Sequence, residues 1–267
     1  MPAPLRKLFA LFPLHVYPGQ SVTSRPASPT LWIHSPNLST SPRLSRDVEC
    51  LKWQAYLALR GITNISLRWD ISPDGGINGA LPALHLPTGD LLGPTRIPAW
   101  VDSVLRSPLD ELEGYRDEQS RDESRAWIAL LEGVVHNALA VSIPHHFSIK
   151  NFLDTPNIVD LVALFQRQLP LLPGLRAPIP IWGRSTPSVT TLIRYRDAIQ
   201  SVSDRLGDDE WFLGSSAPTA LDALVFAYLH VALGGSKQLR EEVLNRPNLV
   251  SWRRKVSELI DPAPLPS

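Results

Sequence analysis

Between residues 221 and 233 the chain is almost continuously apolar (LDALVFAYLHVAL). A run without a polar face predicts a helix that is buried on most sides. Thr219 precedes this run and Asp222 follows three residues later, which is a shortened form of the Ser/Thr-x-x-Glu capping box. In such a box the Thr219 hydroxyl accepts from backbone N–H groups of the first turn, and the Asp222 carboxylate reaches back to the N–H of Thr219. We therefore expect both residues to be structural.

Apolar spacing and capping residues predict further helices along the chain. They lie at residues 47–60, 96–105, 123–143, 155–170, 188–206, 237–244 and 248–260. Gly61, Pro144 and Pro247 fall at the ends of such helices, where glycine and proline stop or separate them. The second half of the chain, residues 123–260, is therefore predicted to be all-helical.

Residues 30–106 show a different pattern of short apolar or alternating runs. Residues 31–34 and 65–69 read as strands, and two more short strands flank the Thr88-Gly89-Asp90 turn within residues 80–92. With the helices, the order is β-α-β-β-α, that of a thioredoxin-like domain. The predicted fold class is thus α/β plus all-α, with a thioredoxin-like domain at 30–106 and a helical domain at 123–260. A flexible, Pro-rich segment at 1–29 precedes them, and a charged linker at 107–122 joins them.

Composition narrows the classes of function. The 26 basic and 26 acidic side chains cancel, so the chain offers no basic field for a nucleic-acid partner. Cys50 is the single cysteine, which excludes an internal disulfide and is typical of a reducing compartment. No stretch approaches the roughly 20 apolar residues that span a bilayer. Arg6 and Lys7 precede a short apolar patch that Pro13 interrupts, so the N-terminal segment is either an anchor or a flexible tail rather than a signal peptide.

Two features together resemble the glutathione transferases. The capped apolar helix is similar to the buried central helix of their C-terminal domain, and Pro82 stands where they carry a cis-proline beside the ligand. The resemblance implies a hydroxyl or thiol after the first strand, which stabilises the glutathione thiolate, and a Glu-Ser pair after the fourth strand. Here Ser35 occupies the first place, but Gly93-Pro94 occupies the second and supplies no polar side chain. We therefore expect no glutathione binding, no cofactor and no enzymatic activity.

Longer strings resemble the metaxins, which are glutathione-transferase-like proteins of the mitochondrial outer membrane. The strings lie at residues 47–61, 72–86, 206–229 and 246–256, and LGDDEWFLGSSAPTALDALVFAYL at 206–229 is the most specific. They are most similar to the small, second type of metaxin, a fungal subunit of the sorting and assembly machinery. This implies a peripheral protein of the cytosolic face that receives β-barrel precursors. Its partners would be a membrane-embedded β-barrel core subunit and a second metaxin-like subunit. The alternatives are a glutathione transferase or thiol-handling enzyme of the same fold, or a cytosolic scaffold.

No metal site is expected from the spacing of possible ligands. His145 and His146 are adjacent and cannot easily face one ion, and His136 has no cysteine or carboxylate near it at zinc-ligand spacing. Cys50 lies beside Leu51 on the apolar face of a predicted helix, which favours a buried and inert thiol.

Overall fold

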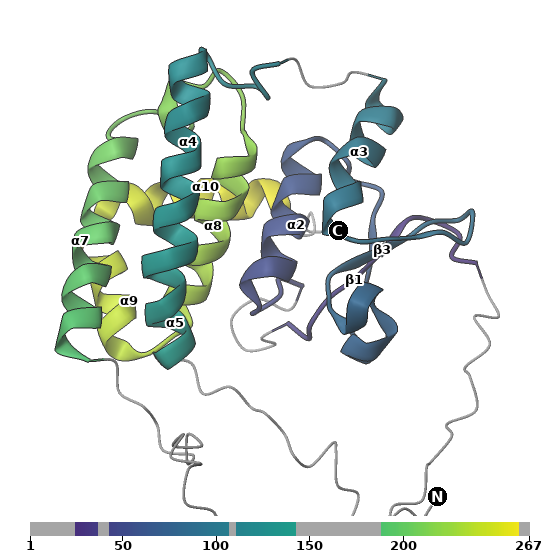
Figure 1. The fold of residues 1–267 in the computed structure, drawn as a ribbon, viewed down its shortest axis with the longest axis horizontal. Coiled ribbons are helices and arrows are strands. Elements are labelled where there is room, and N and C mark those ends of the chain that lie inside the picture. The colour runs from purple at the N-terminus through teal and green to yellow at the C-terminus, as the bar shows by residue number, and fades with distance from the viewer. Residues whose placement is uncertain (1–24, 37–42, 107–110, 143–187, 262–267) are drawn as a thin grey trace, which may run out of the picture.

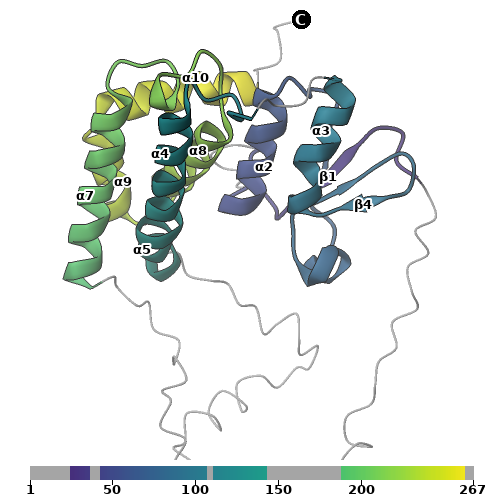
Figure 2. The same cartoon turned by 45° about the horizontal axis from the view of Figure 1, so that its top comes forward.

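The computed structural model describes residues 25–36, 43–106, 111–142 and 188–261 (Figure 1). Within these ranges a small sheet with its helices lies beside a helical unit, as both views show (Figure 2). The expected two-part fold, thioredoxin-like and then all-helical, is confirmed. The helix expected at 155–170 and most of the N-terminal segment lie outside the described residues. In the part of the chain that is described, no helix is long and apolar enough to cross a membrane.

The sheet has four short strands in the order β2-β1-β3-β4. They are β1 (Thr30–Trp32), β2 (Ser66–Arg68), β3 (Ala83–His85) and β4 (Leu91–Leu92). β1 runs parallel to β2 and antiparallel to β3, with Trp32 opposite Ala83, and β3 runs antiparallel to β4, with Leu84 opposite Leu92. This register places the carboxyl ends of β1 and β4 at the same end of the sheet as the start of β3.

Helix α2 (Val48–Leu59) stands between the sheet and the helical unit, where it packs against α8 (Ala220–Leu233) (Figure 1). Because it has neighbours on two sides, half of its 12 residues are buried, including Cys50, Leu51 and Ala55 at 0% exposure. Asp47 caps the helix, since its Oδ1 accepts from the backbone N–H of Cys50 at 2.9 Å. The sheet unit is completed by α3 (Ile97–Leu105).

The remaining helices surround α8. They are α4 (Glu118–Leu130), a π-helical turn (Leu131–Val135), α5 (His136–Ser142), α7 (Val189–Leu206), α9 (Lys237–Leu244) and α10 (Pro247–Ile260). α4 begins earlier than the helix expected at residue 123, because Asp117 accepts from the backbone N–H of Ser120 at 2.7 Å and caps it there. Glu118, Arg121 and Asp122, which the sequence pattern places in a linker, thus lie in the first turns of a helix.

The start of α8 is organised by one buried carboxylate. The capping box between Thr219 and Asp222 is present, and Asp222 has no exposed surface. Its Oδ2 accepts from both the N–H and the hydroxyl of Thr219, each at 2.7 Å, and its Oδ1 accepts from the N–H of Phe212 at 2.9 Å. Burial raises the pKa of Asp222 to about 6, although these hydrogen bonds favour the charged form and oppose the rise. The carboxylate thus ties the segment before α8 to its first turn.

Replacing Asp222 by alanine should destabilise the protein more than replacing Thr219. Asp222→Ala leaves two buried N–H groups without an acceptor, at roughly 1–3 kcal/mol each, so a loss of about 3 kcal/mol or more is expected. Thr219→Ala removes one hydroxyl of the box and should cost about 1 kcal/mol. Urea denaturation followed by circular dichroism measures both losses. Asp74→Ala, at an exposed turn, is the control and should change stability by less than about 0.5 kcal/mol. Equal losses for Asp222→Ala and Asp74→Ala would show that the carboxylate does not organise α8.

Candidate functional site

Three sequence-predicted positions meet at one end of the sheet. Ser35 follows β1, the cis bond between Leu81 and Pro82 precedes β3, and Gly93 follows β4. The strand register brings these positions together although they are far apart along the chain. Ser35 is exposed, and its Oγ accepts a hydrogen bond from Nη2 of Arg46 at 3.3 Å. The site therefore presents a hydroxyl to solvent beside a guanidinium group.

The connection from β4 to α3 lacks polar side chains at its first two positions. Gly93 is buried, and Pro94 begins a 3₁₀ turn (Pro94–Arg96) that has no side-chain cap. Gly93 and Pro94 directly follow β4, which is the place where the sequence resemblance implies a Glu-Ser pair. Thr95 and Arg96 come next, and both are exposed. Their hydroxyl and guanidinium groups are the first polar side chains at this corner of the site.

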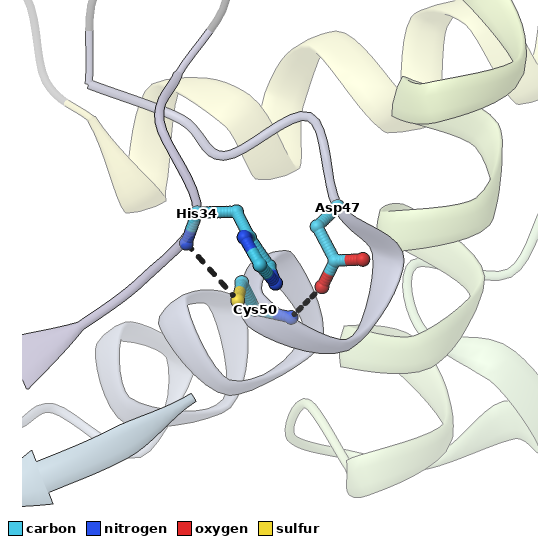
Figure 3. Close-up of side chains that lie close together, drawn as sticks. All are labelled: His34, Asp47 and Cys50. Atoms are coloured by element: carbon cyan, nitrogen blue, oxygen red, sulfur yellow. Dashed lines mark hydrogen bonds between the residues drawn. The ribbon is translucent and has the colours of Figure 1, made fainter. Parts of the chain in front are cut away.

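A cluster that the sequence analysis missed lies beside this site. The ligand atoms of His34, Asp47 and Cys50 all fall within 4.8 Å of one another (Figure 3). The backbone N–H of His34 points at Sγ of Cys50, 3.4 Å away, and Asp47 caps the helix turn that carries Cys50. Zinc-ligand spacing could have suggested Asp47 and Cys50, which are three residues apart, but nothing in the chain indicates that His34 joins them.

Cys50 has the surroundings of an unreactive thiol. Its side chain has no exposed surface. Burial is the main reason that the pKa of this thiol lies far above its usual range, and the negative charge of Asp47 raises it further. The thiol is therefore protonated at neutral pH, as the sequence prediction of a buried, unreactive cysteine requires.

The other histidines of the described residues have structural surroundings. Nδ1 of His136 lies 3.4 Å from the hydroxyl of Tyr228, and the two rings meet edge to face. Nδ1 of His230 lies 2.7 Å from Nη2 of Arg253; burial, and to a smaller extent the charge of Arg253, lower the pKa of His230 to about 4. His145 and His146 lie outside the described residues.

The fold is that of the glutathione transferases. Residues 195–256, from within α7 to within α10, match the family model described as glutathione S-transferase, C-terminal domain. The chain therefore has a glutathione-transferase-like C-terminal domain behind a small mixed sheet. No curated protein matches the chain in sequence.

Solved glutathione transferases share this fold at low sequence identity. A glutathione S-transferase from Methylobacterium radiotolerans, in complex with glutathione sulfonate, is 16% identical with a TM-score of 0.50, over 90% of this chain and 98% of that one. The β-etherase LigF from Sphingobium sp. is 16% identical with a TM-score of 0.53, over 88% of this chain and 100% of that one. A glutathione transferase family member from Pseudomonas fluorescens, with bound S-(propanoic acid)-glutathione, is 19% identical with a TM-score of 0.50. The match covers 90% of this chain and 100% of that one.

These comparisons correct the expectation that the chain is not an enzyme. That expectation rested on Gly93-Pro94, which lacks the polar side chains of a Glu-Ser pair. The solved structures with this fold include two with bound glutathione derivatives and a β-etherase, so this fold gives no ground for excluding an enzyme. One missing pair of contacts was too narrow a basis for excluding an enzyme.

The burial of Cys50 predicts slow modification in the native protein. Because Cys50 is the single cysteine, an aromatic disulfide reagent reports on it alone. Release of the coloured thiol should be at least about 100-fold slower in the folded chain than in urea, since the thiol reacts only after local opening. Rapid stoichiometric release under native conditions would contradict the buried, protonated thiol.

Proposed function

We propose that this protein is a thiol-handling enzyme of the glutathione-transferase type, with Ser35 as the residue that stabilises the thiolate. The observation that carries the proposal is the exposed Ser35 hydroxyl at the end of β1, hydrogen-bonded by Arg46. It stands at the end of the sheet where cis-Pro82 and the β4–α3 connection also lie. The similarity of the fold to solved transferases supports the same class of ligand.

The chemistry follows from the partners of Ser35. Its hydroxyl donates to the sulfur of a bound thiolate, while the guanidinium of Arg46 donates to Oγ and strengthens the hydroxyl as a donor. Both effects favour the charged form of the ligand thiol and lower its pKa. The thiolate sulfur then bonds to an electrophilic carbon, whose leaving group departs with the bonding electrons, while the thiol proton passes to solvent.

Gly93 and Pro94, which follow β4, affect which thiol the site would prefer. With no Glu-Ser pair, an α-amino group of the ligand has no acidic partner there. A carboxylate can still be held by the exposed guanidinium of Arg96 and the hydroxyl of Thr95. We infer that the preferred ligand is a small thiol with a carboxylate, and that glutathione itself binds weakly.

Ser35→Ala should lower kcat/KM for conjugation of glutathione to an aromatic electrophile by roughly 100-fold, the scale of losing one preorganised hydrogen-bond donor. The pKa of the bound thiol, read from the pH profile of thiolate absorbance, should rise toward its value in water. Ser201→Ala is the matched control, because Ser201 is an exposed serine on α7, away from the sheet. Equal effects of the two variants, or activity in neither the variant nor the wild type, would refute the role of Ser35.

The double variant Gly93→Glu/Pro94→Ser should bind glutathione more tightly than the wild type. Gly93 has extended backbone angles (φ −84°, ψ 173°), which any residue adopts, and a Cβ there meets Ile77 at an ordinary 3.5 Å. One hydrogen bond to a charged group contributes about 1.5–3 kcal/mol, so a gain of at least about tenfold is expected by calorimetry. Gly93→Ala/Pro94→Ala, which adds no polar group, is the control. Equal affinities of the two double variants would place the ligand elsewhere.

A second candidate function follows from the metaxin-like strings. In this proposal the protein is a peripheral subunit at the cytosolic face of the mitochondrial outer membrane. It binds a membrane-embedded barrel subunit and a second metaxin-like subunit, and it receives β-barrel precursors. The observation that favours it is β2, an edge strand in the order β2-β1-β3-β4 whose Ser66 and Arg68 are exposed. An exposed strand edge can accept an extended peptide through main-chain hydrogen bonds.

Cross-linking in isolated mitochondria tests this second function. A photoreactive group at Ser66 should label the last strand of an arriving barrel precursor, while the same group at Ser201 on α7 should not. Protease added to intact mitochondria should cleave the protein, and affinity purification should recover the barrel subunit with it. Labelling of the barrel subunit alone would exclude a receptor role, and absence from mitochondria would exclude the location.

A further inference from the structure

The cluster of His34, Asp47 and Cys50 combines a nitrogen, an oxygen and a sulfur donor around one point (Figure 3). We propose that these three side chains form a binding site for a divalent cation of the zinc class. The proposal goes beyond the function suggested above and does not depend on it, because neither Ser35 nor the β4–α3 corner belongs to the cluster.

The donor set selects the class of cation. Zinc accepts imidazole nitrogen, thiolate sulfur and carboxylate oxygen together, commonly with three protein ligands and one open position. Magnesium and calcium prefer sets made only of oxygen, so a site with a sulfur and a nitrogen disfavours them. Three ligands from this chain leave the fourth position for water or for a small ligand.

The spacing of the donor atoms is close to what such an ion needs. With metal–ligand bonds of about 2.0–2.3 Å, ligands at tetrahedral corners lie roughly 3.6 Å apart. The donor atoms of the cluster lie within 4.8 Å of one another, so closure requires shifts of about 1 Å. The side chains of His34 and Asp47 are only partly buried, and their rotation would supply these shifts.

The backbone that carries the three ligands is held together by its own hydrogen bonds. The N–H of His34 donates to Sγ of Cys50 at 3.4 Å, and the hydroxyl of Ser45 donates to the carbonyl of His34 at 3.1 Å. The N–H of Asp47 donates in turn to Oγ of Ser45 at 3.2 Å. The end of β1 and the start of α2 are thus tied to each other before any ion binds, which reduces the entropy cost of assembling the site.

Within the part of the chain that the structure describes, two of the three side chains keep donor atoms that could bind an ion. Asp47 uses Oδ1 for the helix cap, so its second carboxylate oxygen is the one that would bind a cation. Among the residues that the structure describes, neither ring nitrogen of His34 has a hydrogen bond, although its backbone N–H and carbonyl are both engaged. Figure 3 shows the imidazole and the carboxylate facing one another across the Cys50 turn. The side chains of His34 and Asp47 are partly exposed, whereas Cys50 is fully buried.

Titration of the full-length reduced protein with divalent cobalt tests the site. A cysteine ligand produces a sulfur-to-cobalt charge-transfer band in the near ultraviolet, so the expected result is a saturable band that zinc removes by competition. Cys50→Ser should abolish the band. His34→Ala should weaken cobalt binding by at least about tenfold, the loss that follows even when an outer-shell partner of a metal ligand is removed.

A pair of cap variants separates metal binding from folding. Asp47→Asn keeps a good N-cap but removes the anionic ligand, so it should retain the helix and lose at least about tenfold in cobalt affinity. Asp117→Asn makes the same change at the cap of α4 and should leave the affinity unchanged. Ser35→Ala should also keep the band, whatever its effect on thiol chemistry.

Three results would overturn the proposal. They are cobalt binding without a sulfur charge-transfer band, a band that survives in Cys50→Ser, and equal affinities of Asp47→Asn and Asp117→Asn. The first result is what adventitious binding to other histidines of the chain would produce.

Discussion

The carboxylate of Asp222 is the interaction on which most of this structure depends. It is fully buried, yet it accepts hydrogen bonds from Phe212 and Thr219, so the charge removed from water is replaced by three donors. Such a group is costly to bury and more costly to leave unpaired, which makes the geometry around it specific. Because α8 is the helix that the others surround, fixing its first turn also fixes the surface against which α2 packs.

Helix α2 connects its interface with α8 to the candidate sites. Its central residues are buried between the sheet and α8, and its first turn carries Cys50 under the Asp47 cap. Arg46, which donates to Ser35, stands one residue before that cap. Both the proposed thiol site and the proposed cation site therefore lie at the junction between β1 and α2, next to the interface that holds α2 in place.

The transferases share the fold of this protein, but a shared fold does not determine the chemistry of the site. The fold is shared at 16–19% identity, which does not fix a substrate. Gly93-Pro94 removes contacts at one corner of the ligand site, whereas the thiolate would be stabilised at another corner, by Ser35. The loss of binding groups at one place thus predicts weaker or altered recognition, and it does not imply the absence of an enzyme.

The sequence by itself determined the features that depend on near neighbours. Helical periodicity, the Thr219–Asp222 box and the β-α-β-β-α order all arise from residues a few positions apart, and the structure has them where they were expected. The start of α4 was misplaced because a charged first turn resembles a linker until Asp117 is seen to cap it. Only the tertiary structure decided that Ser35 and cis-Pro82 lie at the same end of the sheet and that the backbone N–H of His34 donates to Cys50. These arrangements depend on strand register and on helix packing between distant segments, which local sequence patterns do not encode.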